Sequence, residues 1–207
     1  MSKAISVIDY GCGNLASVVN MIQHVGGEGR IIRTPDELDS AAKVVLPGVG
    51  AFDHGIGSLR QGGWVKPLEQ AVHERQIPIM GICLGMQLLT RGSEEGQEPG
   101  LGWVDAQAIR FRPENPRLKV PHMGWNEVRQ ARADELLPES ATPRRFYFVH
   151  TYRVECADPA DVLLECEYGE AFVAAFRRAN IWGFQFHPEK SQTYGLEFLS
   201  RFLEWRP

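Results

Sequence analysis

The segment 81–85, with the sequence G-I-C-L-G, constrains the fold more than any other part of this chain. It joins a short apolar run at 77–80 to a helix-like run at 86–90. A glycine two residues to each side of Cys83 permits a sharp turn without clashes of Cβ atoms. At a helix N-terminus the backbone N–H groups favour a thiolate, the nucleophilic form of cysteine. The segment therefore fits a nucleophile at the end of a strand, or a buried core cysteine beside a turn.

The first half of the sequence alternates β-branched runs with amphipathic stretches of helical length. Strands are predicted at 4–9, 30–33, 43–46 and 77–82, and helices at 15–25, between 54 and 75, and at 84–90. This alternation is typical of a parallel sheet with helices on both faces.

The second half follows a different pattern, in which short strands are separated by turn residues. Strands are predicted at 103–111, 125–129, 145–154, 162–168, 171–177 and 181–186, with a loop at 93–100 and a closing helix at 194–205. Successive strands indicate added antiparallel pairing. We therefore predict a mixed α/β fold, with a mostly parallel central sheet flanked by helices and added antiparallel strands, in a single domain over residues 1–207.

Composition excludes several classes of function. A net charge of -4 gives no electrostatic reason for binding nucleic acid or an anionic membrane. No apolar run is long enough to span a membrane, and Asp9 comes too early for a secretory signal peptide. Four cysteines lie far apart without C-x-x-C spacing, which predicts neither a metal site nor disulfides and favours the reducing cytoplasm. Apart from Cys83, we interpret them as structural: Cys12, Cys156 and Cys166.

A second candidate site lies at the end of the last predicted strand. Because side chains alternate along a strand, Gln185 and His187 share one face. Pro188 favours extended backbone at His187, so Glu189 is predicted to emerge on the same side. An imidazole beside a carboxylate can act as a base whose tautomer is fixed. Alone, the segment also fits a solvated histidine and glutamate; together with Cys83 it favours a Cys–His–Glu site.

The loop at 47–52, with the sequence P-G-V-G-A-F, follows the third predicted strand. In a parallel sheet such a loop lies at the same carboxyl edge as the Cys83 turn. Its glycines let backbone N–H groups turn toward a ligand, and with the N–H of Leu84 they are predicted to bind an oxyanion. The same sequence also fits a plain tight turn. Since glycine peptides reorient at low cost, we hypothesise that residues 47–50 form a gate.

Taken together, P-G-V-G, G-I-C-L-G-M-Q and F-H-P-E, in this order and spacing, resemble the class I glutamine amidotransferases. Four further segments, at 9–14, 121–126, 148–152 and 187–191, are similar to one branch of that family, the glutaminase subunits of imidazole glycerol phosphate synthases of histidine biosynthesis. The resemblance extends over most of the chain. It implies a flavodoxin-like fold, and it implies no cofactor.

The resemblance also implies roles for individual residues. Cys83 would attack the side-chain amide of glutamine to form a thioester, His187 would move the protons, and Glu189 would orient His187. Gln87 would contact the bound glutamine. The oxyanion would be held by backbone N–H groups of Gly48, Val49, Gly50 and Leu84.

A partner subunit follows from the same resemblance. Ammonia in water is mostly protonated and loses its nucleophilic lone pair, so it must reach its acceptor by a shielded path. The 207 residues leave no room for a synthase domain, which implies a heterodimer with a (β/α)₈-barrel cyclase that makes imidazole glycerol phosphate and an aminoimidazole carboxamide ribotide. The residues expected near this partner or the ammonia exit are Asn14, His122, Trp125, Tyr152 and Lys190.

Other interpretations remain open from the sequence. A glutaminase serving a different synthase, of the sugar-amination or vitamin B6 type, or another cysteine hydrolase, would keep the same catalytic residues. The segment 11–16, G-C-G-N-L-A, also fits a dinucleotide-binding turn, with Arg33 placed for an NADP phosphate. That oxidoreductase alternative leaves Cys83, His187 and Glu189 without roles. A catalytically silent scaffold is disfavoured because every expected catalytic position is filled.

Overall fold

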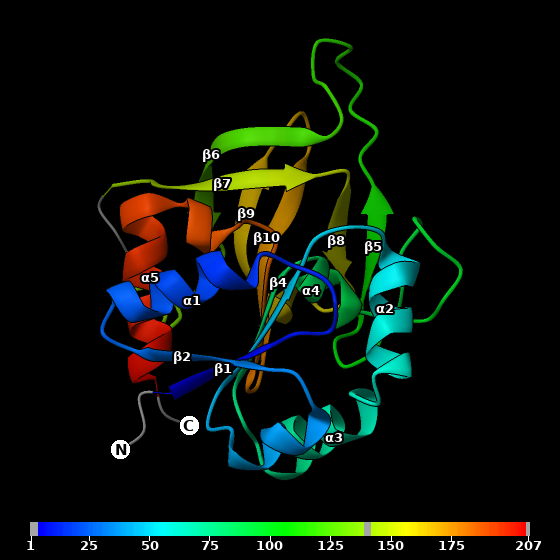
Figure 1. Ribbon diagram of the computed structural model, residues 1–207. Coiled ribbons are helices and arrows are strands. Elements are labelled where there is room, and N and C mark those ends of the chain that lie inside the picture. Colours follow the sequence, from blue (N-terminus) through cyan, green and yellow to red (C-terminus); the bar gives the residue numbers. More distant parts are fainter. Residues whose placement is uncertain (1–3, 139–141, 206–207) are drawn as a thin grey trace.

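The computed structural model describes residues 4–138 and 142–205, so the termini and residues 139–141 of the predicted domain lie outside the described residues. Within that part of the chain, eleven strands form one continuous sheet (Figure 1). One half of the sheet is parallel and positions the candidate site, while the other half is antiparallel.

The parallel half has the strand order β2-β1-β3-β4-β11. Its strands are β1 (Ala4–Ile8), β2 (Glu28–Ile32), β3 (Val44–Gly48), β4 (Ile79–Cys83) and β11 (Ile181–Phe184). Since β11 occupies the fifth place, the order is that of flavodoxin-like sheets, in which ligands bind at the carboxyl ends of the strands. β4 lies between β3 and β11, and its last residue is Cys83.

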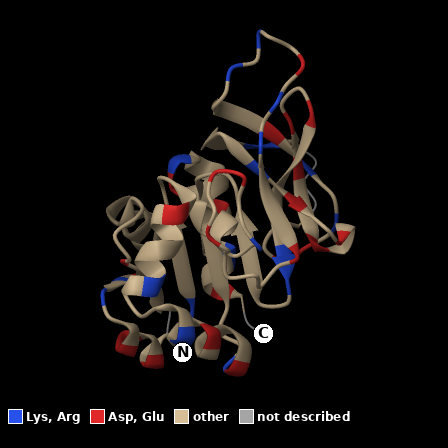
Figure 2. Cartoon of the chain, turned by 90° about the vertical axis from the view of Figure 1, so that its right-hand side faces the viewer, with Lys and Arg blue, Asp and Glu red and all other residues tan. Residues whose placement is uncertain are grey.

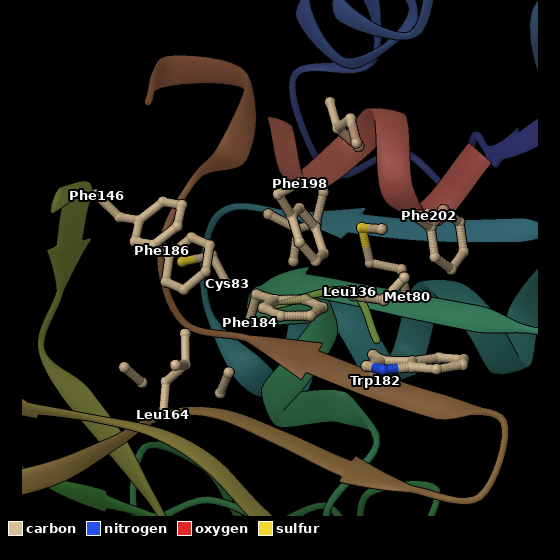
Figure 3. Close-up of a cluster of buried hydrophobic side chains, with 14 of the residues drawn as sticks. Met80, Cys83, Leu136, Phe146, Leu164, Trp182, Phe184, Phe186, Phe198 and Phe202 are labelled. Atoms are coloured by element: carbon tan, nitrogen blue, oxygen red, sulfur yellow. The ribbon is translucent and has the colours of Figure 1, made fainter. Parts of the chain in front are cut away.

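Helices cover both faces of this half and divide the core into two clusters. On one face lie α1 (Leu15–His24) and α5 (Gln192–Glu204); Figure 3 shows α5 side chains packed against those of β11. On the other lie α2 (Phe52–Gln61), α3 (Val65–Glu69) and α4 (Leu84–Leu88). Successive residues of β3 belong to different clusters, because side chains along a strand point alternately to the two faces of the sheet. No helix among the described residues combines the length and hydropathy needed to cross a membrane.

The antiparallel half continues the sheet in the order β11-β10-β9-β6-β7, with β8 paired to β10 and β5 to β8. Its strands are β5 (Ala106–Arg110), β6 (His122–Gln130), β7 (Arg144–His150), β8 (Tyr152–Cys156), β9 (Val162–Glu167) and β10 (Ala171–Arg178). In Figure 1 these strands stand beside the parallel half, and β7 passes close to α5. Short helical turns complete the fold: η1 (Pro35–Ser40), η2 (Gln70–Glu74), η3 (Pro159–Asp161) and η4 (Pro188–Lys190).

The predicted mixed α/β architecture is confirmed, and two of its elements differ in detail. The strand predicted at 145–154 is two strands that bend at Thr151, because β7 pairs with β6 whereas β8 pairs with β5 and β10. The helix predicted between 54 and 75 is α2, α3 and the π-helical η2. It breaks at Gly63, whose φ of 71° lies in the left-handed region that glycine accommodates.

Close backbone packing fixes the junction between β4 and α4. A Cβ atom at Gly85 would overlap the carbonyl oxygen of Leu46 on β3, and one at Gly81 would lie 2.7 Å from the carbonyl carbon of Gly85. The two glycines therefore let α4 lie directly against the sheet.

We expect Gly85→Ala to lower the free energy of unfolding by about 3 kcal/mol or more, because backbone atoms cannot yield to the added methyl group. Gly57→Ala is the matched control: Gly57 is also helical, nothing lies within 4 Å of its Cβ position, and it should stabilise the chain by about 0.5–1 kcal/mol. Urea unfolding of both variants measures the difference. Equal stabilities would contradict this description of the junction.

Candidate active site

Cys83 has the backbone geometry of a nucleophile at a strand-to-helix turn. Its φ is 52° and its ψ is -107°, a strained conformation for a residue with a side chain. β4 ends at this residue and α4 begins at Leu84. The turn predicted from G-I-C-L-G is therefore present, and its strain lifts the sulfur out of the regular strand.

The Cys83 side chain lies at the boundary between the core and a cavity. The residue is 8% exposed and belongs to the cluster that contains Phe184 and Phe186 (Figure 3). The amide Nε2 of Gln185 lies 3.7 Å from its sulfur, and the carbonyl oxygen of Val149 lies 3.9 Å from it. The sulfur thus meets apolar rings on one side and polar groups on the other.

His187 and Glu189 form a buried pair. His187 has extended backbone (φ -100°, ψ 98°), and its Nδ1 lies 2.7 Å from Oε1 of Glu189, with both side chains at most 3% exposed. Burial lowers the pKa of His187, but the interactions with Cys83 and with the Glu189 carboxylate outweigh it and raise the pKa to about 10. The cysteine and the carboxylate beside the ring therefore favour its protonated form. Its Nε2 makes no conventional hydrogen bond to the described residues and remains available to a reactant.

The backbone of His187 is fastened to the free edge of β7. Its N–H donates to the carbonyl of Tyr147 (2.9 Å). The Ser191 hydroxyl donates to the His187 carbonyl (2.6 Å) and accepts from the Tyr147 N–H (3.0 Å). Ser191 is fully buried. These bonds hold the segment carrying the imidazole in one position.

A cavity of about 300 Å³ opens beside the cysteine. It brings together seven of the residues predicted from the sequence: Cys83, His187, Gln87, Leu84, Val49, Gly50 and Tyr152. Glu189 lies behind His187, and Gly48 pairs with Cys83 in the register of β3 and β4. Gly48 has no room for a side chain, because a Cβ atom would lie 2.6 Å from the Tyr10 hydroxyl. Gly50 has a φ of 114°, which favours glycine.

Four polar residues of the site were not predicted, among them Thr151, which lines the cavity. Gln185 accepts from the Gln87 amide (3.1 Å), and strand alternation had placed it on the face of His187. Glu95 lines the cavity and accepts from the Phe52 N–H (2.8 Å); its loop offers no sequence signal. His150 lines the cavity from the end of β7, within the F-V-H-T-Y segment.

The five residues expected near a partner occupy different environments. Asn14 caps α1 by accepting from the Ser17 N–H. Trp125 is 38% exposed, and its ring and the Lys190 ammonium both lie against Tyr147, at 6.2 and 5.7 Å. Tyr152 lines the cavity, and its carbonyl oxygen accepts a hydrogen bond from the side-chain amide of Gln87. His122 is buried beneath the surface, stacked on Tyr168 and Phe148.

The remaining cysteines contrast with Cys83. Burial raises the pKa of Cys156 and of Cys166 to about 12, and burial also raises the pKa of Cys12. The raised pKa favours the thiol over the more nucleophilic thiolate at each of them. Within residues 4–138 and 142–205, no group of three His, Cys, Asp or Glu side chains could hold a metal ion. Arg33, the candidate for an NADP phosphate, forms an ion pair with Asp9.

Comparison with known proteins agrees with this geometry. The sequence model of the family described as glutamine amidotransferase class-I matches residues 6–205. The chain is 48% identical to imidazole glycerol phosphate synthase subunit HisH 2 of Pseudomonas aeruginosa, over 97% of this chain and 98% of that one. It is 42% identical to the protein of the same name from Methanococcus maripaludis, over 97% and 98%. Among solved structures, PurLQS from Thermotoga maritima superposes with a TM-score of 0.73 at 21% identity, over 98% of this chain and 96% of that one.

The fold and the site together define the class: the chain belongs to the class I glutamine amidotransferases. It is a glutamine-hydrolysing enzyme, and the resemblance based on its motifs is confirmed. The oxidoreductase alternative has no support in these comparisons.

We expect Glu189→Gln to lower the pKa of His187 by about one to three pH units, because an amide does not stabilise the imidazolium as a carboxylate does. The raised pKa stabilises the fold fully below the ordinary value of 6.5, and this contribution is lost as the pH rises toward about 10. Titration of the imidazole by NMR measures the change. Glu127→Gln, at an exposed position of β6, is the control and should leave the titration unchanged. An unaltered pKa of His187 in Glu189→Gln would contradict the assigned pairing.

Proposed function

We propose that this chain is the glutaminase subunit of an imidazole glycerol phosphate synthase, and that it supplies ammonia to a separate cyclase subunit. The proposal depends most on the Cys83–His187–Glu189 arrangement at the cavity. The similarity to two HisH subunits over nearly their whole length supports the choice of synthase. In this proposal residues 1–207 act as one domain in the cytoplasm, without a cofactor.

The reaction begins with attack of the Cys83 sulfur on the carbonyl carbon of the glutamine side-chain amide. The imidazolium of His187 gives a proton to the amide nitrogen, so the C–N bond breaks, ammonia leaves and a thioester forms. Neutral His187 then takes a proton from water, which attacks the thioester and releases glutamate and the sulfur. Glu189 holds Nδ1 throughout, which keeps Nε2 directed at the reacting groups.

The negative oxygen of each tetrahedral intermediate needs donors. Leu84 follows the nucleophile and begins α4, and the loop after β3 lines the same cavity through Val49 and Gly50. Backbone N–H groups of these residues and of Gly48 are proposed to bind the oxygen. Loss of one such donor lowers kcat by about 10²–10³.

The amino-acid end of glutamine carries a positive and a negative charge. Glu95 places a carboxylate at the cavity, suited to the α-ammonium group. Gln87, held by Gln185 and by the Tyr152 carbonyl, offers an amide to the substrate. The Glu95 carboxylate would favour a free α-ammonium group over a peptide N–H.

The partner is proposed to dock beside the mouth of the cavity. The exposed large apolar side chains among the described residues are Val49, Met123 and Trp125. Val49 lines the cavity, and Trp125 and the exposed Lys190 both lie near the ring of Tyr147. Figure 2 shows basic and acidic residues interspersed along the antiparallel strands, without a continuous basic stripe in that view, which supports a protein partner rather than a nucleic acid. Asn14 is assigned to the same interface.

Cys83→Ala should abolish glutamate release, because no other group can form the thioester. Release of glutamate by the purified chain, alone and with a barrel cyclase and its nucleotide ligand, is the measurement. Cys12→Ala, another buried cysteine, is the control and should retain activity. Turnover in Cys83→Ala would contradict the mechanism, and activity indifferent to that cyclase would indicate another synthase.

Lys190→Glu should weaken binding of the cyclase by about tenfold, through reversal of a charge at the rim of the interface. Lys66→Glu, an equally exposed lysine on α3, introduces the same charge change away from the cavity and should have no effect. Titration of the cyclase while glutamate release is followed gives both affinities. Equal affinities would exclude Lys190 from the interface.

A further inference from the structure

Two buried histidines lie next to the site and have no role in the mechanism above. His122 on β6 and His150 on β7 stand opposite each other in register. Their rings meet through Nδ1 of His122 and Nε2 of His150, 3.1 Å apart. Such a pair in a core needs a stable arrangement of hydrogens, since a charge there would be costly.

The neighbours of the pair fix both tautomers. The Tyr152 carbonyl can only accept, so Nδ1 of His150 donates to it at 2.8 Å. Nε2 of His150 then accepts, and Nδ1 of His122 donates. The remaining nitrogen of His122 faces the Asn126 amide at 3.5 Å. Burial lowers the pKa of His122 to about 4 and of His150 to about 3, so both rings are neutral near pH 7.

The other end of this chain of bonds reaches the nucleophile. The Tyr152 carbonyl that accepts from His150 also accepts from Nε2 of Gln87, at 3.3 Å. Gln87 donates to Gln185 at 3.1 Å, and the amide of Gln185 lies 3.7 Å from the Cys83 sulfur. The Tyr152 carbonyl therefore links the histidine pair to Gln87 and Gln185 beside the cysteine.

The chain bends where this carbonyl lies. β7 ends at His150 and β8 begins at Tyr152, and the corner between them lines the cavity. The Phe111 N–H donates to the Thr151 carbonyl. The His150 imidazole donates to the Tyr152 carbonyl, the next one along the chain. Without the imidazole, the Tyr152 carbonyl would lose a donor and Gln87 would lose a fixed acceptor.

We propose that His150 is a positioning residue for glutamine binding, acting on Gln87 through the Tyr152 carbonyl, and that His122 fixes the tautomer this requires. The proposal rests on the proposed function, since it takes glutamine as the ligand of the cavity. It assigns the pair to substrate affinity and leaves the chemical step to Cys83 and His187.

Two substitutions of nearly equal shape separate hydrogen bonding from packing. His150→Leu removes the donor to Tyr152, whereas His150→Asn places an amide N–H near the position of Nδ1. With the cyclase complex, His150→Leu should raise the KM for glutamine about tenfold with kcat within about twofold, as expected for loss of one hydrogen bond in ground-state binding. His150→Asn should restore the KM to within about threefold of the unsubstituted value.

Phe172→Leu is the control for packing, because Phe172 contacts both histidine rings without forming a hydrogen bond to them. It should lower the Tm and leave the KM unchanged. Calorimetry of glutamine binding in a Cys83→Ala background should show the same loss of affinity in His150→Leu, without turnover.

NMR of the imidazole nitrogens tests the tautomers in the unsubstituted chain, without any folding risk. Both rings should be neutral at pH 7 and carry hydrogen on Nδ1; hydrogen on Nε2 of His150 would overturn the inference. A Cys83-dependent glutaminase whose KM is unchanged in His150→Leu would also overturn it, while the proposed function would stand. A chain that neither binds nor hydrolyses glutamine would overturn both.

Discussion

The left-handed backbone of Cys83 is the constraint on which the site depends. It is tolerated because Gly81 and Gly85 let the start of α4 touch the sheet, so the sulfur is held by backbone packing. The other groups of the site must therefore be positioned around a sulfur atom whose place is fixed. The neighbours of β4 supply them from the same edge: β3 continues into the loop carrying Val49, and β11 continues into the segment carrying His187.

β7 links the antiparallel half to this chemistry. It lies at one end of the sheet order, where a strand exposes unpaired backbone groups. Here those groups are used: the N–H and carbonyl of Tyr147 bond to Ser191 and His187, and the Val149 carbonyl faces Cys83. The edge that would otherwise invite aggregation instead positions the segment that carries the His187 imidazole.

Sequence reasoning succeeded where the chemistry lies within one short segment. Cys83 with its glycines, and His187 with Glu189, follow from local geometry alone. It failed where two distant strands meet. The pairing of His122 with His150 depends on the register of β6 and β7, and the contact of Gln87 with Gln185 depends on the packing of α4 against β11. The bend at Thr151 was missed for the same reason, since a change of strand partner leaves no mark on an alternating sequence.

These contacts hold the groups of the site in two different ways. The sulfur is held by the close packing of backbone atoms at Gly81 and Gly85. The His187 imidazole is held by Glu189 while its backbone N–H bonds to β7, and the amide of Gln87 donates to the Tyr152 carbonyl and to Gln185. Trp125 and Lys190 lie against Tyr147, whose backbone holds His187. If the proposed cyclase docks there, we expect it to act first on the backbone that holds His187, while the nucleophile stays where the turn places it.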